Sequence, residues 1–174
     1  MGMSRDTQPV EAIIALGGNL GDVRKSFIGA REMLSVEPGI SLLASSRLYR
    51  SAPMGPQDQA DYLNAVVIIQ CNLSALQLLH RMQAIELHFG RRRDGQRWGE
   101  RTLDLDLIAY NDTQMQSPEL TLPHPGMQER MFVLQPLCDI RPDWRHPITG
   151  KTAGEMLRQR IVAGEHPLGE GEIW

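Results

Sequence analysis

Residues 97–108 read RWGERTLDLDLI, and from Leu103 to Leu107 they alternate strictly between leucine and aspartate. Successive side chains of a β-strand point to opposite faces, so the alternation predicts a strand with its leucines on one face. Asp104 and Asp106 then share the other face. Two adjacent carboxylates repel each other unless positive charge compensates them. Mg²⁺ suits such a pair because this ion prefers carboxylate and phosphate oxygens, so the pattern predicts a magnesium site.

The segment before this strand is rich in arginine, with Arg91, Arg92, Arg93, Arg97 and Arg101. The planar guanidinium group is suited to binding phosphate. Glycines among the arginines give the backbone conformational freedom, so this segment is predicted to form a mobile lid that closes over a phosphate chain and excludes water. A single arginine or aspartate would be interpreted as a solvated surface residue. Together the two groups indicate a site for metal-bound polyphosphate.

Composition is that of an ordinary globular protein. The 174 residues fit one domain, and residues 1–9 and 164–174 are expected to be loosely held tails. A net charge of −3 gives no basic signal for nucleic acid or an anionic membrane. No apolar run reaches transmembrane length, and residues 1–9 are polar, without the apolar segment typical of a signal peptide. Cys71 and Cys138 fit no metal or redox spacing. We therefore expect a cytoplasmic monomer with reduced cysteines and neither nucleic-acid nor membrane partners.

The rest of the chain supplies the other elements of the fold. Apolar periodicity predicts, in chain order, a strand at Val10–Leu16, a helix at Leu20–Leu34, strands at Ile40–Tyr49 and Tyr62–Cys71, a helix at Leu73–Phe89 and a strand at Leu103–Tyr110. The order β-α-β-β-α-β is the ferredoxin-like arrangement of the α+β class, an antiparallel sheet with helices on one face. The proline-rich segment from Glu119 onward should add short helices and extended pieces, including a last helix at Glu155–Ile161.

Three further motifs allow two interpretations each. Residues 17–21, GGNLG, could cradle phosphate or form a structural turn into a helix, and the missing Lys-Ser/Thr favours the turn. Tyr62 and Asn64 share a strand face, and they either bind a flat heterocycle or serve ordinary cross-strand packing. His124 is either a donor to phosphate or a structural loop histidine. The remaining histidines are interpreted as structural or solvated.

Taken together, these residues resemble the 6-hydroxymethyl-7,8-dihydropterin pyrophosphokinase family of folate biosynthesis. The resemblance runs from the first strand to the region of Phe132, and the block containing the aspartates is its most specific part. The matching blocks are Ala15–Gly21, Gly55–Gln59, Asp61–Asn64, Arg97–Asp106 and Leu122–His124. Several independent blocks in the right order make coincidence implausible.

The resemblance implies an ATP-dependent diphosphotransferase. Such an enzyme moves a whole pyrophosphate group from ATP to the hydroxymethyl group of the pterin and releases AMP, with two Mg²⁺ ions taking part. The implied catalytic residues are Arg91, Arg101, Asp104 and Asp106, of which the two aspartates bind magnesium. The implied pterin-binding residues are Ser51, Met54, Tyr62, Asn64 and Phe132, with Tyr62 and Phe132 on either side of the ring. The implied nucleotide-binding residues are Gln83, Glu86, Arg93, Arg97, Trp98, Thr121, His124 and Arg130.

Several points stay open at this stage. The chain departs from the family pattern at Gly18, Ala52 and Pro125, and beyond about Ile140 it matches poorly, so no function is assigned there. No general base is singled out: either aspartate is a candidate, or the alcohol keeps its proton until the transition state. RNA-binding modules share the fold but use sheet aromatics, which are scarce here at 5%. A small regulatory nucleotide-binding domain would need neither the aspartate pair nor a pterin pocket.

Overall fold

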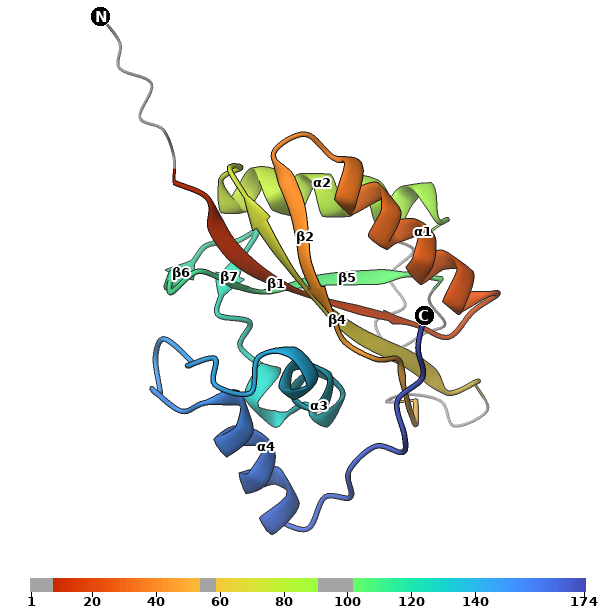
Figure 1. The fold of residues 1–174 in the computed structure, drawn as a ribbon, viewed down its shortest axis with the longest axis vertical. Helices are drawn as coiled ribbons and strands as arrows, with labels where there is room; N and C mark the ends of the chain where they lie inside the picture. Colours follow the sequence, from red (N-terminus) through yellow and green to blue (C-terminus); the bar gives the residue numbers. More distant parts are fainter. Residues whose placement is uncertain (1–7, 54–58, 91–101) are drawn as a thin grey trace, which may run out of the picture.

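The computed structural model describes residues 8–53, 59–90 and 102–174, and Figure 1 shows how its elements are arranged. The strands are β1 (Val10–Gly18), β2 (Ile40–Ser45), β3 (Tyr49–Ser51), β4 (Tyr62–Cys71), β5 (Asp104–Tyr110), β6 (Met115–Gln116) and β7 (Thr121–Leu122). The helices are α1 (Val23–Val36), α2 (Ala75–His88), α3 (Met131–Ile140) and α4 (Ala153–Val162), with a 3₁₀ turn, η1, at Met127–Glu129.

The main sheet is antiparallel, with its long strands in the order β2-β4-β1-β5 and with β3 beside β4. The central strand, β1, is buried on both faces from Ala12 to Leu16. β6 and β7 form a separate two-stranded hairpin. The mixed helix and antiparallel-sheet architecture confirms the predicted α+β class and the β-α-β-β-α-β order of its core.

The strand predicted at Ile40–Tyr49 is interrupted, so that β2 and β3 pair with β4 separately. The register of β2 on β4 shifts between Leu42 and Ala44. After this shift, Ser46 donates its backbone N–H to the Val66 carbonyl and accepts the Val66 N–H on its hydroxyl, both at 2.8 Å. A side-chain oxygen thus replaces a ladder carbonyl and ends the regular pairing. Apolar alternation alone carries no sign of this break.

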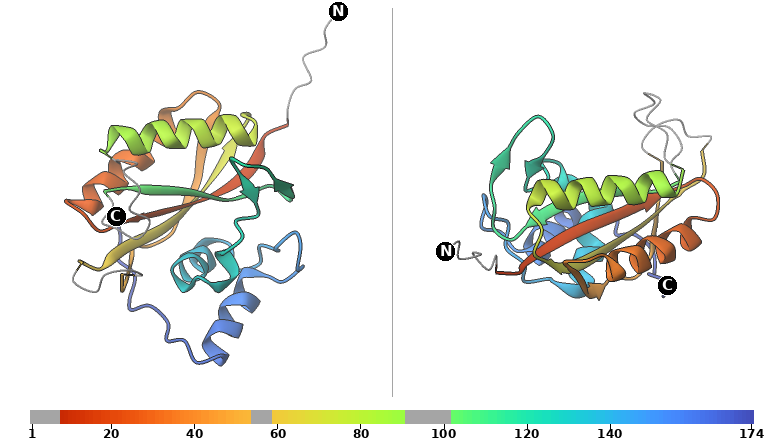
Figure 2. Two further views of the ribbon diagram at one scale, coloured as in Figure 1. Left: turned by 180° about the vertical axis from the view of Figure 1, so that it is seen from behind. Right: turned by 90° about the horizontal axis from the view of Figure 1, so that it is seen from above.

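Helices α1 and α2 cover one face of the sheet (Figures 1 and 2). Both begin at side-chain caps: Asp22 accepts the Lys25 N–H, and Ser74 forms a reciprocal capping box with Gln77. The core beneath them contains all three leucines of residues 103–107. The leucine face predicted from the alternating sequence is therefore the face that packs against these helices.

The turn between β1 and α1 confirms the structural interpretation of residues 17–21. β1 continues through Gly18, and Gly21 has a φ of 74°. That φ lies in the left-handed region, where a side chain would be strained. Asp22 follows as the cap of α1, so the glycine-rich segment serves the end of a strand and the start of a helix.

The opposite face of the sheet is partly covered by α3, against which α4 packs (Figure 2). A second apolar cluster lies there, in which Val66 and Ile68 of β4 pack with Val133 and Leu137 of α3. The sequence predicted short helices in this part of the chain without locating α3. Pro136 lies inside that helix and removes an intrahelical hydrogen bond, so the proline-rich pattern there did not indicate a regular helix.

The C-terminal tail is held at several points, which differs from the loosely held tail that its glycines predicted. Gln135 exchanges hydrogen bonds of 3.1 and 2.7 Å with the backbone of Leu168. The Trp174 ring packs edge-on against Phe27, with 5.9 Å between ring centroids, and its indole N–H donates to the Ser46 carbonyl at 2.6 Å. An indole that is packed and hydrogen-bonded fixes a glycine-containing segment that has few apolar residues of its own.

Tyr49 of β3 is hydrogen-bonded to the end of α3. Its hydroxyl donates to the Asp139 carboxylate, whose two oxygens lie at 2.8 Å, and the Arg47 backbone N–H donates to the same carboxylate at 3.2 Å. Burial, and then the neighbouring carboxylate, raise the pKa of Tyr49 to about 12, because both disfavour the phenolate. The short strand β3 is in this way fixed to the helix that covers it.

Replacing Tyr49 with phenylalanine is expected to lower the free energy of unfolding by about 1–3 kcal/mol, because the Asp139 carboxylate loses a donor. The raised pKa gives a second signature. Neutral Tyr49 contributes stability below its ordinary pKa of 10.0, and that contribution is lost as pH rises toward about 12. Urea unfolding at neutral pH and across this alkaline window should show the parent and the variant converging. A difference that is constant with pH would contradict the assignment.

Two findings bear on the compositional expectations. Within the described ranges, no helix has the length and apolar character needed to cross a bilayer. Cys71 and Cys138 are both free thiols, and burial raises the pKa of Cys138 to about 11. The raised pKa keeps this thiol protonated and unreactive at neutral pH.

Candidate active site

Residues predicted to bind the pterin and the metal meet on the sheet face that carries α3. Four residues pair in succession across the sheet: Tyr49 of β3 pairs with Asn64 of β4, Asn64 with Gly17 of β1, and Gly17 with Asp104 of β5. Paired residues of antiparallel strands project to the same face, so Asn64 and Asp104 lie on either side of Gly17. Asp106 is two residues along β5 and therefore faces the same way. The sheet register brings together residues that are far apart in the sequence.

Asn64 is buried and its side-chain amide is fixed. It is 4% exposed, and its Nδ2 donates to Ser51 Oγ at 2.8 Å and to the Tyr49 carbonyl at 3.3 Å. These bonds use the amide nitrogen on the side of β3. The amide oxygen is turned toward β1, since a Cβ built on Gly17 would lie 4.0 Å from it. Ser51, predicted to line the same pocket, therefore acts by orienting Asn64.

Asp104 and Asp106 project from β5 away from the main core, as the alternation predicted. Both are half-buried, whereas Leu105 between them is buried. From the helix side, the carboxylate of Glu86 accepts the Leu105 backbone N–H at 2.9 Å, and Glu86 is 2% exposed. Among the described residues, no group of three or more His, Cys, Asp or Glu side chains could hold a metal ion.

His124 lies close to Asp106 and Arg130. Its backbone N–H donates to the Ile108 carbonyl of β5 at 2.8 Å, and its Nδ1 accepts the Gly126 N–H at 3.2 Å. Burial lowers its pKa, the nearby Asp106 opposes this shift, and Arg130 adds to it. A neutral ring whose Nδ1 is an acceptor carries its proton on Nε2. His124 can then donate a hydrogen bond without bringing a charge.

The two aromatic residues predicted to hold the pterin lie on this same face. Tyr62 begins β4 and is half-buried. Phe132 is in the first turn of α3, which packs on β3 and β4, and it is partly buried against the second apolar cluster. The Arg130 guanidinium lies 5.6 Å from the centroid of the Phe132 ring. This placement puts a cation next to one of the two aromatic rings.

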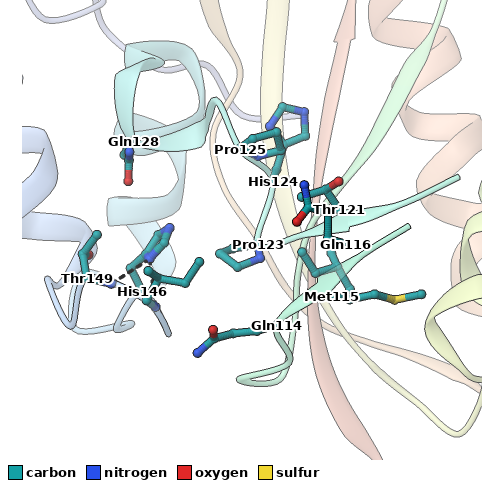
Figure 3. Close-up of a pocket in the computed structure, with 12 residues that line it drawn as sticks. Gln114, Met115, Gln116, Thr121, Pro123, His124, Pro125, Gln128, His146 and Thr149 are labelled. Carbon is teal, nitrogen blue, oxygen red and sulfur yellow. Dashed lines mark hydrogen bonds between the residues drawn. The ribbon is translucent and has the colours of Figure 1, made fainter. Parts of the chain in front are cut away.

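Thr121 and His124 line a cavity of about 450 Å³. Figure 3 shows this cavity between the β6–β7 hairpin, the segment that leads into α3, and the loop that carries His146. The other lining residues are Gln114, Met115, Gln116, Leu122, Pro123, Pro125, Gln128, His146, Ile148 and Thr149. Gln83, the remaining described residue on the predicted nucleotide side, is on α2 and half-buried.

Comparison with known protein families agrees with this arrangement. The model of the 7,8-dihydro-6-hydroxymethylpterin-pyrophosphokinase family matches residues 13–142, which is well over half of the chain. The chain belongs to this family. The match covers the sheet except for the first three residues of β1, together with α1, α2 and α3, and it confirms the resemblance noted in the sequence.

Curated relatives carry the family name. The 2-amino-4-hydroxy-6-hydroxymethyldihydropteridine pyrophosphokinase of Synechocystis sp. is 44% identical over 160 residues, covering 92% of this chain and 81% of the relative. That of Haemophilus influenzae is 45% identical over 134 residues, covering 77% and 83%. The folic acid synthesis protein fol1 of Schizosaccharomyces pombe is 40% identical over 146 residues, which are 84% of this chain and 20% of that protein.

Solved structures share the fold. The HPPK-DHPS protein of Plasmodium falciparum, solved as wild type with pteroate, superposes with a TM-score of 0.72 at 11% sequence identity. The superposition covers 91% of this chain and 46% of the Plasmodium chain, so this chain spans under half the length of that protein. At this level of identity, the match shows the common α+β architecture.

Several site residues expected from the pyrophosphokinase resemblance lie outside the described residues. They are Met54, Arg91, Arg93, Arg97, Trp98 and Arg101. The predicted lid segment also falls almost entirely there. Their roles stay predictions that rest on the sequence.

Sequence reasoning did not place Gly17 next to Asn64 and Asp104: for residues 17–21 it weighed a phosphate cradle against a structural turn and favoured the turn. Period-two alternation from Ile13 would have placed Gly17 on the aspartate face, but only the register shows that it separates Asn64 from Asp104.

His146, interpreted as structural or solvated, is 5% exposed. Its Nδ1 accepts the backbone N–H groups of Ile148 and Thr149 at 3.2 Å each, so it holds its own loop together.

Proposed function

We propose that this chain transfers the pyrophosphate group of ATP to the hydroxymethyl group of 6-hydroxymethyl-7,8-dihydropterin, giving the pterin diphosphate and AMP for tetrahydrofolate biosynthesis. Membership of the family makes the chain a pyrophosphokinase of folate biosynthesis. The observation that carries the substrate assignment is the row from Asn64 across Gly17 to Asp104. This row places an amide that can hydrogen-bond to a heterocycle on the same sheet face as carboxylates that can bind a metal-bound phosphate.

The pterin side of the site consists of a fixed amide and two aromatic side chains. Asn64 offers its oxygen as an acceptor for ring N–H groups, because its nitrogen is held by Ser51 and Tyr49. A flat heterocycle can stack between Tyr62 and Phe132. A buried amide whose orientation is fixed discriminates between ring edges, since a wrong edge leaves a polar group without its partner.

The chemistry of the donor set fits Mg²⁺. Asp104 and Asp106 supply carboxylate oxygens on one strand face, and Mg²⁺ usually takes one or two carboxylates together with substrate phosphates. The absence of a third acidic or histidine ligand among the described residues agrees with that pattern. Two bound ions would supply neutralisation of the charge that develops on the transferred phosphates.

The nucleotide side is formed by the residues around the hairpin and α2. Arg130 provides a cation near His124, and His124 a neutral donor, while Thr121 lines the adjoining cavity. Gln83 and Glu86 are on the α2 face toward β5, and Glu86 also holds that strand through Leu105. The protein would act mostly by positioning the two substrates and by favouring negative charge, as is general for phosphoryl transfer.

We further propose that the enzyme works in the cytoplasm as a monomer, with its two substrates as its partners and without nucleic acid or a membrane. The net charge of −3 supports the part of this proposal that concerns nucleic acid and membranes, because binding to either favours a basic surface.

The test of the function is a product analysis. The protein is incubated with ATP and Mg²⁺, with and without 6-hydroxymethyl-7,8-dihydropterin. AMP and the pterin diphosphate should appear together, and no AMP should form when the pterin is omitted. Release of ADP instead would indicate transfer of a single phosphate. Binding of ATP with no AMP under either condition would favour a regulatory nucleotide-binding domain.

Replacing Phe132 with alanine is expected to weaken pterin binding and leave ATP-analogue binding nearly unchanged. Ring stacking contributes about 0.5–1.5 kcal/mol beyond area burial, so the dissociation constant should rise about two- to tenfold or more. Isothermal titration with each ligand measures the two affinities separately. Phe132→Tyr keeps the ring and should bind like the parent. Equal losses for both ligands would point to general unfolding.

A further inference from the structure

Gly17 is the one residue from Ala12 to the end of β1 at Gly18 that is not buried. Residues Ala12 to Leu16 and Gly18 are buried, while Gly17 is partly exposed. On the α3 face, the covering helices therefore stop short of the row that contains Gly17. The opening lies between the fixed amide of Asn64 and the carboxylate of Asp104.

The protein has room for a side chain at this position. A Cβ built on Gly17 meets only the Asn64 Oδ1 and the Leu63 carbonyl within 4 Å among the described residues, both at 4.0 Å. These are ordinary contact distances, and no left-handed backbone angle is recorded for Gly17. Neither packing against the described residues nor backbone strain thus requires glycine here. Glycine also weakens the interior of a strand, so its presence is not explained by the stability of β1. Among the described residues, nothing fills the space above Gly17.

The distance between neighbouring strands indicates which part of a bound acceptor would occupy that space. Neighbouring strands are about 4.8 Å apart, so the backbones of Asn64 and Asp104 are separated by about 10 Å. A heterocycle hydrogen-bonded to Asn64 must reach across β1 for its alcohol to come near the β5 carboxylates. The shortest path from one to the other passes directly over Gly17.

We propose that Gly17 is a specificity-determining residue of the acceptor pocket, whose missing side chain lets the hydroxymethyl arm of the acceptor cross from Asn64 to the aspartate pair. This inference rests on the proposed function, because it concerns the acceptor of that reaction. It assigns to Gly17 a role that neither the turn nor the core of the protein demands.

The experiment compares Gly17→Ala with the parent and with Gly169→Ala. Gly169 is exposed, has nothing within 4 Å of a built Cβ, and has no left-handed φ recorded, so it controls for a glycine-to-alanine change as such. Each protein is tested by thermal unfolding and by titration with 6-hydroxymethylpterin, with pterin that lacks the 6-substituent, and with an unreactive ATP analogue plus Mg²⁺.

We expect Gly17→Ala to unfold at the same temperature as the parent or higher, and to bind the ATP analogue as the parent does. Its affinity for 6-hydroxymethylpterin should fall about tenfold or more, because an added methyl group overpacks a close contact. Its affinity for unsubstituted pterin should change by less than about threefold. Gly169→Ala should match the parent in every measurement.

Two outcomes would overturn the inference: unchanged binding of 6-hydroxymethylpterin by Gly17→Ala, or an equal loss for the substituted and unsubstituted pterins. Failure of the proposed function looks different. In that case the parent itself neither binds 6-hydroxymethylpterin nor forms AMP with its dihydro form, whereas an error confined to Gly17 leaves the parent fully active.

Discussion

Asp106→Asn is expected to lower turnover about 100- to 10,000-fold, because metal stabilisation of transition-state charge contributes several kcal/mol and each 1.36 kcal/mol is a factor of ten. Asp104→Asn should behave in the same way. Both carboxylates project from one face of β5, so each is expected to supply a large share of the charge that holds the metal. The rate of AMP formation at saturating substrates measures the loss.

The fold should survive these substitutions. Asparagine has the shape of aspartate, and removing one of two adjacent negative charges relieves repulsion, so thermal unfolding should occur at the same temperature or slightly higher. Asp112→Asn, in the exposed loop after β5, is the matched control and should keep parental activity and Mg²⁺ dependence. Near-normal turnover of Asp106→Asn in Mg²⁺ would show that the metal assignment is wrong.

The sheet could be predicted because its sequence signals are local and its faces differ. The alternation in β5 places leucines on the helix side, and apolar periodicity located α1 and α2, although their caps, Asp22 and Ser74, begin these helices slightly later than predicted. The interruption between β2 and β3 could not be predicted, since it depends on the Ser46 hydroxyl meeting the Val66 N–H across the sheet. The position of α3 escaped prediction for the related reason that burial against β4 outweighs the hydrogen bond lost at Pro136.

The candidate site, like the fold, could be predicted from the sequence only in part. The shared face of Asp104 and Asp106 follows from a period of two residues, as does that of Tyr62 and Asn64. The bond from Asn64 to Ser51 and the place of Gly17 between two functional side chains depend on the register of three separate strands. Register is set by tertiary packing and strand connections, so a single sequence shows which residues share a face but not which of them are neighbours.

Glu86 shows how the aspartate pair is supported from the other side of the sheet. β5 is an edge strand, paired with β1 alone in the main sheet, so alternate backbone N–H groups on its outer side need partners. Glu86 reaches from α2 to accept the N–H of Leu105, the residue between the two aspartates. A charged acceptor makes a stronger hydrogen bond than a neutral one. The segment that carries Asp104 and Asp106 is thereby held to the helix layer.

Glu86→Ala is accordingly expected to lower the free energy of unfolding by about 2–3 kcal/mol, because a buried N–H loses its acceptor, and to reduce turnover as the aspartates lose their alignment. Glu86→Gln keeps an acceptor of the same size and should recover most of the stability. Urea unfolding and the rate of AMP formation are measured on both variants. If alanine and glutamine lowered turnover equally while stability stayed parental, Glu86 would act on the nucleotide through its charge. If only alanine lowered both quantities, the residue acts by holding β5, which is the outcome that its burial and its bond to Leu105 favour.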